Sequence, residues 1–206
     1  MKAERMIISI GRECGSGGHE IGKKLAQHYG INYYDENILG ELAKRGSFDP
    51  NDFSKTEEKV TGKFFHHHSG SFSAENRDLA DSMSKSDQLF LMEKDLIEEL
   101  ARKESFVIVG RAAEAILKDD PNTLRIFVYA EEDFRLPRVK EYFHLLTNEE
   151  ARKQMLKIDK QRKEYFNYYT DEEWGSRKGH DFMIDSSLLG VDETVEAIIA
   201  IADKKF

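Results

Sequence analysis

The sequence predicts an α/β protein with a parallel sheet, from three observations. Five short runs rich in Ile, Val, Phe and Tyr recur along the chain, and each has the length of a strand. The runs are continuously apolar rather than alternating, as strands covered on both faces require. Segments with helical periodicity lie between them, which favours right-handed crossovers between parallel strands.

The first strand and helix are the clearest elements. The expected strands are, in chain order, Met6 to Ile10, Ile31 to Tyr34, Phe106 to Val109, Leu124 to Tyr129 and Phe182 to Ile184. Between the first two, Ile21, Leu25 and Tyr29 share one helical face, and Gly30 stands where a helix would end.

Three further helical patterns follow. Residues Asp78 to Glu104 predict a long crossover helix before the third strand. Residues Glu131 to Phe166 predict a charged helical region that breaks near Pro137 and again where Thr147 or Asn148 could cap a new helix. Residues Thr194 to Ala202 predict the last helix.

Composition limits the function classes. The 206 residues carry a net charge of -8, with 39% hydrophobic residues and a mean hydropathy of -0.63, which fits one globular domain. An acidic protein is poorly attracted to nucleic acid or to anionic lipid, so we expect neither partner. No apolar run is long enough for a signal peptide or a membrane span. A lone Cys14 fits a reducing cytoplasm, and we expect it to be a small filling residue.

The segment from Gly46 to Asn76 lacks a core period and predicts an insertion or mobile lobe. It contains the run His66, His67, His68. Three adjacent histidines cannot all face one metal from regular structure, and no zinc-like spacing accompanies them. A solvated loop is the better interpretation, and the sequence predicts no metal-ligand set.

The stretch "SIGRECGSGGHEIG" places glycines between the first strand and the first helix. The residues at its centre are Gly15, Ser16, Gly17 and Gly18. A strand, a glycine turn and a helix N-terminus direct several backbone N–H groups at one point, and such a point binds phosphate. Glycine permits both the unusual backbone angles and the close approach of an anion.

The loop departs from the known phosphate-binding signatures. A full Walker A pattern would need glycine at Arg12, lysine at Gly18 and a hydroxyl residue at His19. A dinucleotide fingerprint would need a small residue at Glu20, although Asp35 ends the second strand where a ribose-binding acid would lie. A glycine turn that binds no ligand therefore remains an alternative.

Basic residues recur in three later segments. Arg111 follows the third strand at the edge of the sheet where ligands bind in open α/β folds. The stretch "FRLPR" places Arg135 and Arg138 three residues apart, and "KIDKQRKEYFNYYT" carries Asp159 and Arg162. Each cluster alone is compatible with a solvated helical face.

Together these segments resemble the cytidylate kinase-like family, a divergent relative of the cytidylate kinases. The resemblance rests mainly on "GRECGSGG" and "IVGRAAEAIL", with "YYDENIL", "EEDFRLPR" and the late "IDSS" in the same order. It implies a three-layer α/β/α P-loop kinase fold with a five-stranded parallel sheet. It also implies one domain over 1–206, with an inserted monophosphate-binding lobe at about 36–90 and a lid at about 140–175.

The resemblance also implies roles for single residues. Gly15, Ser16, Gly17, Gly18, His19 and Glu20 would surround the donor phosphates of ATP. Arg111 would hold the acceptor monophosphate, although the aspartate expected after it is Ala112. Arg138 and Arg162 would close over the transferring group. Asp35, Asp159 and Asp185 would match acids of the substrate site, although the serine expected after the first of them is Glu36.

The absent lysine is the weak point of this interpretation. Phosphoryl transfer needs positioning, Mg²⁺ and cations where charge develops. Lys23 and Lys24 lie more than one turn into the helix and should point away from the loop, so Arg12 and Arg162 are the better substitutes. Losing one preorganised donor costs about 3 kcal/mol of transition-state stabilisation. Glu20 and Asp35 could hold metal-bound water, since Mg²⁺ keeps most of its waters.

The expected function is therefore an ATP- and Mg²⁺-dependent nucleoside monophosphate kinase, with cytidylate (CMP or dCMP) as acceptor through the resemblance alone. Two alternatives stay open: a phosphotransferase acting on another small molecule, and a nucleotide-sensing protein that lost catalysis with its lysine. The sequence does not reveal the oligomeric state.

Overall fold

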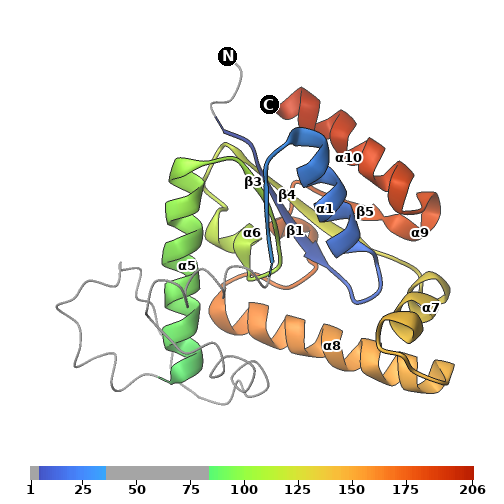
Figure 1. Cartoon of the computed structure of the whole chain (residues 1–206). Coiled ribbons are helices and arrows are strands. Elements are labelled where there is room, and N and C mark those ends of the chain that lie inside the picture. Colours follow the sequence, from blue (N-terminus) through green and yellow to red (C-terminus); the bar gives the residue numbers. More distant parts are fainter. Residues whose placement is uncertain (1–4, 36–83) are drawn as a thin grey trace. The chain divides into compact units, whose positions relative to one another are not determined.

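The computed structural model describes residues 5–35 and 84–206, and the chain forms two compact units. The first unit comprises residues 1–35 and 104–206, and the second comprises 36–103. The first unit contains all five described strands (Figure 1). The inserted lobe predicted for about 36–90, and the run of three histidines within it, lie mostly or wholly outside the described residues.

The sheet of the first unit has five parallel strands in the order β2-β3-β1-β4-β5. The strands are β1 (Ile7–Arg12), β2 (Asn32–Tyr34), β3 (Phe106–Val109), β4 (Thr123–Tyr129) and β5 (Phe182–Asp185). Strand β1 lies at the centre, because Ile7 pairs with Phe106 on one side and with Thr123 on the other. This confirms the predicted parallel sheet, and it extends β1 by two residues so that Arg12 belongs to the strand.

Two helices cover one face of the sheet, α1 (Gly18–Tyr29) and α10 (Val191–Lys205), as Figure 1 shows. Their apolar faces join those of β1, β3 and β4 in a core that includes Ile8, Ile10, Ile21, Leu25, Val107, Val109, Ile126 and Ile198. The approach of α1 is close, because a Cβ atom on Gly22 would lie 2.7 Å from Cγ2 of Val109. A glycine is therefore needed where this helix crosses the sheet.

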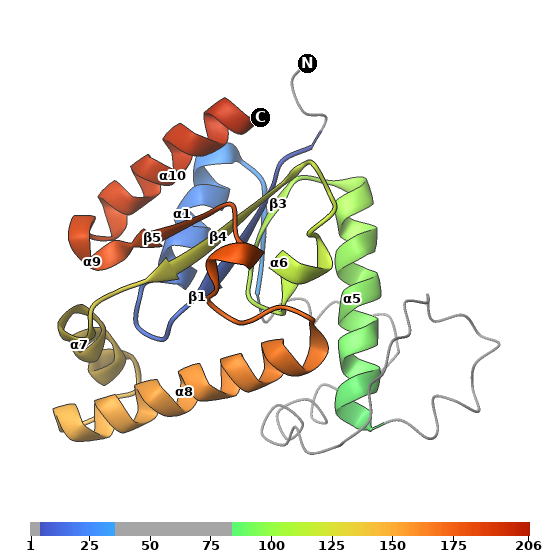
Figure 2. The ribbon, with the colours of Figure 1, turned by 180° about the vertical axis from the view of Figure 1, so that it is seen from behind.

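The opposite face carries the short helix α6 (Ala113–Ile116) and the 3₁₀ turn η2 (Arg177–Gly179), visible in Figure 2. Here Gly11 of β1 lies against Phe127, Glu114 and His180, where a Cβ atom would come within 3.2 Å of each. The arrangement confirms a sheet with helices on both faces. The short α6 was not among the predicted elements, because four residues carry too little periodicity to be recognised.

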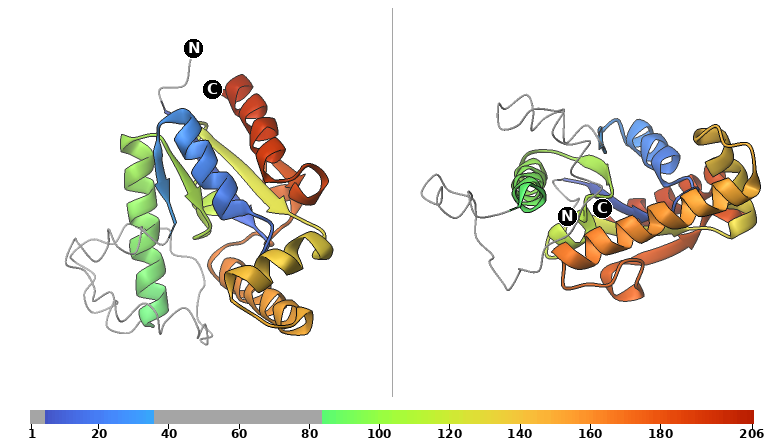
Figure 3. Two further views of the ribbon diagram at one scale, coloured as in Figure 1. Left: turned by 45° about the vertical axis from the view of Figure 1, so that its right-hand side comes forward. Right: turned by 90° about the horizontal axis from the view of Figure 1, so that it is seen from below.

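Helices α7 (Glu132–Tyr142) and α8 (Asn148–Tyr169) lie across the carboxyl ends of the strands (Figure 3). They pack on each other and on Cys14 of the glycine loop through a small apolar cluster of Leu136, Val139, Ala151 and Met155. Thr147 begins α8 with a capping box, in which its hydroxyl accepts from the backbone of Glu150 and the Glu150 carboxylate accepts from the backbone of Thr147. The predicted cap is confirmed.

Pro137 was expected to break the helical region, and this expectation is wrong. Pro137 lies inside α7, and the chain turns only after Tyr142. A proline removes one backbone hydrogen bond, and the burial of Leu136 and Val139 on either side offsets that loss. Residues 84–206 also include α9 (Ser186–Leu189), which was not among the predicted elements.

In the second unit, α5 (Lys85–Lys103) begins after Ser84, whose hydroxyl and Asp87 form reciprocal hydrogen bonds. The part of the predicted crossover helix before Ser84 lies outside the described residues. Among the helices of residues 5–35 and 84–206, none combines the length and the apolar character needed to cross a bilayer.

A buried His180–Glu114 pair should make stability depend on pH. Burial opposes the charge on His180, but the Glu114 carboxylate at 4.0 Å and the Ser176 carbonyl at 2.8 Å raise its pKa overall. The contribution of the pair to the free energy of unfolding is full below about pH 6.5, the pKa of histidine in the unfolded chain. It is lost as pH rises through the higher pKa of His180 in the folded protein. We expect the free energy of unfolding of wild type, relative to His180→Gln, to fall as pH rises above about 6.5. Urea denaturation across this range measures it.

The exposed Gln27 on α1 supplies the control: Gln27→Ala keeps the His180–Glu114 pair, so its free energy of unfolding should differ from that of wild type by a constant amount at every pH. A constant difference between wild type and His180→Gln across the range would contradict the prediction.

Candidate functional site

The glycine loop joins β1 to α1 through two left-handed residues. Gly15 has φ 81° and Gly17 has φ 85°, angles at which a side chain would be strained. Space is short as well, because a Cβ atom on Gly15 would lie 2.8 Å from the carbonyl oxygen of Arg135. The buried Ser16 holds the centre: its hydroxyl donates to Glu13 O (2.9 Å), and its carbonyl accepts from the Ser186 hydroxyl (2.7 Å).

Helix α1 presents unused backbone donors to the mouth of the loop. Its first backbone hydrogen bond runs from Ile21 N to Gly17 O (2.9 Å). In residues 5–35 and 84–206, no acceptor lies on the N–H groups of Gly18, His19 and Glu20, and Gly17 provides no side-chain cap. Such a helix N-terminus, following a turn of left-handed glycines, attracts an anion.

The position of the missing lysine is filled by the Arg12 side chain. A Cβ atom on Gly18 would lie 2.7 Å from Cβ and 2.9 Å from Cγ of Arg12. The Arg12 stem therefore lies directly on the buried Gly18 backbone. Beyond the stem, the guanidinium reaches the end of β3, where a Cβ atom on Gly110 would collide with Nη1 of Arg12. A side chain at residue 18 would therefore require the Arg12 stem to move.

The Arg12 guanidinium is held at one end by His19 and has a buried donor without a partner among the described residues. Its Nη2 lies 3.2 Å from Nε2 of His19, whose Nδ1 lies 2.6 Å from Oδ2 of Asp35. Its Nε is inaccessible to solvent and has no hydrogen-bond partner among the described residues. Burial, and after it the neighbouring charge of Arg162, lowers the pKa of Arg12 to about 9. A buried cation with an unsatisfied donor is suited to a phosphate oxygen.

Asp35 is the anion in the series of contacts from Arg12 through His19 to Asp35. Burial opposes its charge, but the hydrogen bond from His19 and the charges of Arg12 and Arg111 lower its pKa overall. Lys23 and Lys24 do not reach the loop, as expected: Lys23 lies 5.8 Å from the centre of the Tyr33 ring, and Lys24 pairs with Asp192 at 2.7 Å.

A second arginine, Arg135, binds the backbone of the loop and two carboxylates beside it. It is 7% exposed and donates from Nε to Cys14 O (2.7 Å), from Nη1 to Glu13 (3.0 Å) and from Nη2 to Asp159. Asp159 in turn accepts from Cys14 N (2.6 Å). Burial raises the pKa of Glu13 despite the charge of Arg135. Helices α7 and α8 are thus attached to the loop backbone by paired charges.

The two arginines expected to close over the phosphoryl group also lie at the loop. Arg162 donates from Nη1 to the carbonyl oxygen of Arg12 (3.3 Å), and burial lowers its pKa. Arg138 pairs with Glu20 at 2.7 Å and lies beside Gly17, where a Cβ atom would be 3.4 Å from its Nη2. Arg138 of α7 therefore lies at the first turn of α1, and Arg162 of α8 lies at the end of β1.

Arg111 lies in a left-handed turn at the end of β3. Gly110, Arg111 and Ala112 have φ values of 81°, 60° and 53°, and such angles are costly for the two residues with side chains. Strain of this kind concentrates at functional sites. The turn lies beside the Arg12 guanidinium, so the sheet edge predicted for Arg111 is the one at which the loop opens.

The remaining predicted residues have structural partners. Asp185 accepts from Ser187 N (2.9 Å) and caps α9. Asp159 accepts hydrogen bonds from Arg135 and from Cys14 N. Substrate binding by either stays a prediction. The sequence did not indicate the loop-facing partners Glu13, Ser186 and Gly110. Arg135 was noted only as part of "FRLPR", and its burial could have been inferred from the apolar Leu136 and Val139 around it.

The fit to Mg²⁺ is limited to acidic groups that would bind its waters. No group of three or more His, Cys, Asp or Glu side chains is placed to hold a metal in residues 5–35 and 84–206. His19 offers no hydroxyl, and its Nε2 is engaged by Arg12. Glu20 and Asp35 are the carboxylates near the loop, so a magnesium ion would depend chiefly on phosphate oxygens and water.

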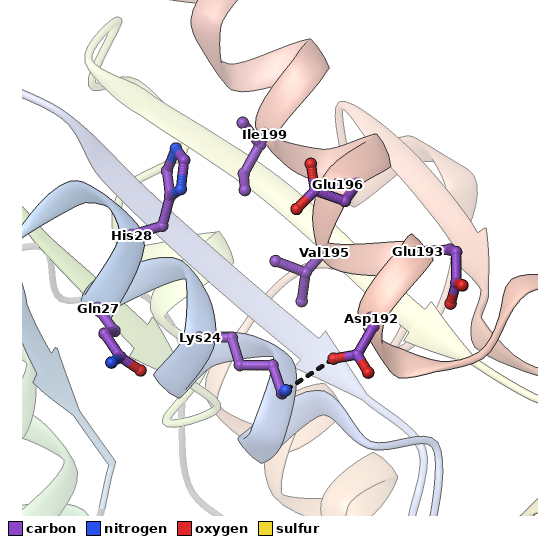
Figure 4. A pocket seen from close by; sticks show the side chains of 8 residues that line it. All are labelled: Lys24, Gln27, His28, Asp192, Glu193, Val195, Glu196 and Ile199. Atoms are coloured by element: carbon purple, nitrogen blue, oxygen red, sulfur yellow. Dashed lines mark hydrogen bonds and ion pairs between the residues drawn. The ribbon is translucent and has the colours of Figure 1, made fainter.

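A shallow groove of about 460 Å³ lies between α1 and α10 (Figure 4). Its lining includes the carboxylates Asp192, Glu193 and Glu196, with Lys24 already paired to the first of these. This negative lining would repel phosphates. The groove is therefore unsuited to a nucleotide, and the glycine loop remains the candidate site.

Comparisons with known proteins identify the family of the chain. The model of the cytidylate kinase-like family matches residues 7–188. A cytidylate kinase from Methanopyrus kandleri is 26% identical over 199 residues, covering 96% of this chain and 93% of that protein.

Two solved structures share the fold. The crystal structure of an uncharacterized protein from Eubacterium ventriosum is 32% identical, covers 97% of this chain and 99% of that one, and has a TM-score of 0.73. A shikimate kinase from Bacteroides thetaiotaomicron, 9% identical, covers 96% of this chain and 98% of that one with a TM-score of 0.56. The second likeness concerns the fold alone.

Gly18→Ala should destabilise the protein, although alanine is the better helix former. The new Cβ would displace the Arg12 stem, and overpacking of this kind costs about 1–3 kcal/mol. Urea denaturation measures the loss, with Gln27→Ala on the exposed face of α1 as the control. An unchanged free energy of unfolding for Gly18→Ala would show that Arg12 does not pack on this residue.

Proposed function

Because the chain belongs to the cytidylate kinase-like family, we propose that it transfers a phosphoryl group from ATP, with Mg²⁺, to a nucleoside monophosphate, and that cytidylate is the acceptor. The observation that carries the proposal is the path of Arg12. Its side chain brings a buried cation to the mouth of the loop from which the lysine is absent.

The loop would bind the donor. The N–H groups of Gly18, His19 and Glu20 would donate to its phosphate oxygens, as helix N-termini do. The Arg12 guanidinium would add its positive charge beside the same phosphates, and its Nε is one of the buried donors that lack a partner among the described residues. These groups are rigid before binding, so they need little reorganisation when charge develops.

The transfer itself depends on cations around the phosphoryl group. An oxygen of the acceptor phosphate attacks the terminal phosphorus of ATP, and the bond from that phosphorus to the ADP oxygen breaks in line. Arg138 and Arg162 would stabilise the charge on the phosphoryl oxygens, and Arg111 would hold the acceptor phosphate. Bound Mg²⁺ supplies further neutralisation of the phosphates.

The choice of cytidylate is supported by the family and by the relative named a cytidylate kinase. Another small acceptor is the second candidate, because Ala112 stands where the resemblance to the cytidylate kinases implies an aspartate of the substrate site. Ala112 is buried and offers no polar group. The shikimate kinase likeness shows that the same fold accommodates an acceptor that is not a nucleotide.

Release of ADP in the presence of ATP, Mg²⁺ and a panel of acceptors tests the proposal. We expect turnover with CMP and dCMP, and a fall in kcat of at least about 100-fold for Arg12→Ala, the loss typical of one preorganised donor. Arg152→Ala, on an α8 arginine that is 57% exposed, should keep wild-type kcat and is the matched control.

The outcomes separate the candidates. Turnover with shikimate or another sugar-like acceptor, and none with monophosphates, would replace cytidylate by the second candidate. A thermal shift with ATP but no turnover with any acceptor would favour a nucleotide sensor. Wild-type kcat in Arg12→Ala would refute the role of Arg12.

A further inference from the structure

The His19 side chain stands between a cation and an anion. Its Nε2 lies 3.2 Å from Nη2 of Arg12, and its Nδ1 lies 2.6 Å from Oδ2 of Asp35 and 3.3 Å from the Tyr33 hydroxyl. His19 is the second residue of α1, and it occupies the position at which a P-loop carries its hydroxyl residue. The imidazole therefore has a defined set of partners in a defined place.

The hydrogen-bond chemistry fixes the proton of this ring. A guanidinium has only donors, so the contact with Arg12 requires a lone pair on Nε2 of His19. The single proton of the neutral ring then lies on Nδ1, where Asp35 accepts it. Asp35 is 13% exposed at its side chain, and its lowered pKa keeps it an acceptor.

The Arg12 guanidinium needs such a partner. Its stem is fixed against Gly18 and its end against Gly110, but neither glycine has a side chain that can accept a hydrogen bond. Arg162 is a second cation nearby, and its charge repels the Arg12 guanidinium. Of the described residues, His19 is the one whose side chain accepts from this guanidinium.

We propose that His19 is a positioning residue, which holds the Arg12 guanidinium in its place beside the glycine loop, while Asp35 holds the ring in the required tautomer. The proposal deepens the function proposed above and rests on it. It assigns to the hydroxyl position of the loop an orienting contact with the substitute cation, in place of a contact with metal.

Calorimetric titration of ATP with Mg²⁺ into the protein tests the proposal without requiring turnover. His19→Ala should weaken ATP binding about 10-fold, as loss of a hydrogen bond to a charged group does. His19→Gln should keep most of the affinity, because an amide oxygen can accept where Nε2 does. The double variant Arg12→Ala with His19→Ala should bind no more weakly than Arg12→Ala alone, since His19 acts through Arg12.

His28→Ala, on an exposed histidine of the same helix, is the control and should bind ATP as wild type does. An unchanged affinity in His19→Ala would overturn the proposal. An equal further loss in the Arg12→Ala background would overturn it as well, because His19 would then contact the nucleotide by itself.

A ligand-free measurement separates this proposal from the proposed function. Nitrogen-15 spectra of the ring should show His19 protonated at Nδ1 in wild type, because Arg12 donates to Nε2 and Asp35 accepts from Nδ1. Protonation at Nε2 in wild type would overturn the proposal. If wild type binds ATP without phosphorylating any acceptor, the proposed function fails while the affinities still decide the role of His19. If wild type binds no ATP, the proposed function fails and the ring spectra decide.

Discussion

The packing of the Arg12 stem on the bare backbone of Gly18 is the contact on which the site depends. Arg12 is the last residue of β1 and pairs in register with Val128, so the central strands of the sheet fix its backbone. From there the side chain crosses the first turn of α1 and ends over Gly110. Two glycines far apart in the sequence are needed for one arginine. Residue 18, where a P-loop usually carries its lysine, is here the glycine on which the Arg12 side chain packs.

Charges that are buried beneath the loop serve a different purpose. Arg135 contacts Glu13, Asp159 and the Cys14 carbonyl, and buried ion pairs of this kind add little stability because desolvation offsets the attraction. They do impose geometry. The Asp159 carboxylate joins α8 to the loop backbone at Cys14, and Arg162 lies one helical turn further along. Fixing Asp159 therefore places Arg162 at the Arg12 carbonyl, and the cations of the site arrive together.

The predictable part of this protein is the part encoded locally. Continuous apolar runs gave all five strands, and Thr147 with Glu150 gave the start of α8, because pleat, burial and capping act over a few residues. The predicted break at Pro137 was wrong because the helix is stabilised by the burial of Leu136 and Val139, which depends on the tertiary structure. The loop was found from its glycines, yet their reasons differ: Gly15 and Gly17 need left-handed angles, whereas Gly18 needs the absence of a side chain. The second reason is visible only once Arg12 is in place.

Under the proposed function, Arg12 would take the part of the loop lysine with a different geometry. A lysine in the first turn of a helix places a compact ammonium on a flexible stem, whereas Arg12 delivers a planar fork from a fixed strand. The guanidinium can bind two oxygens at once. Its burial beside Arg162 lowers its pKa to about 9, so a bound polyanion would stabilise its charged form. The backbone donors at the start of α1 are independent of either side chain. A search for the lysine signature therefore fails on this chain, although three features typical of phosphate-binding loops are present: unused amides, left-handed glycines and a desolvated positive charge.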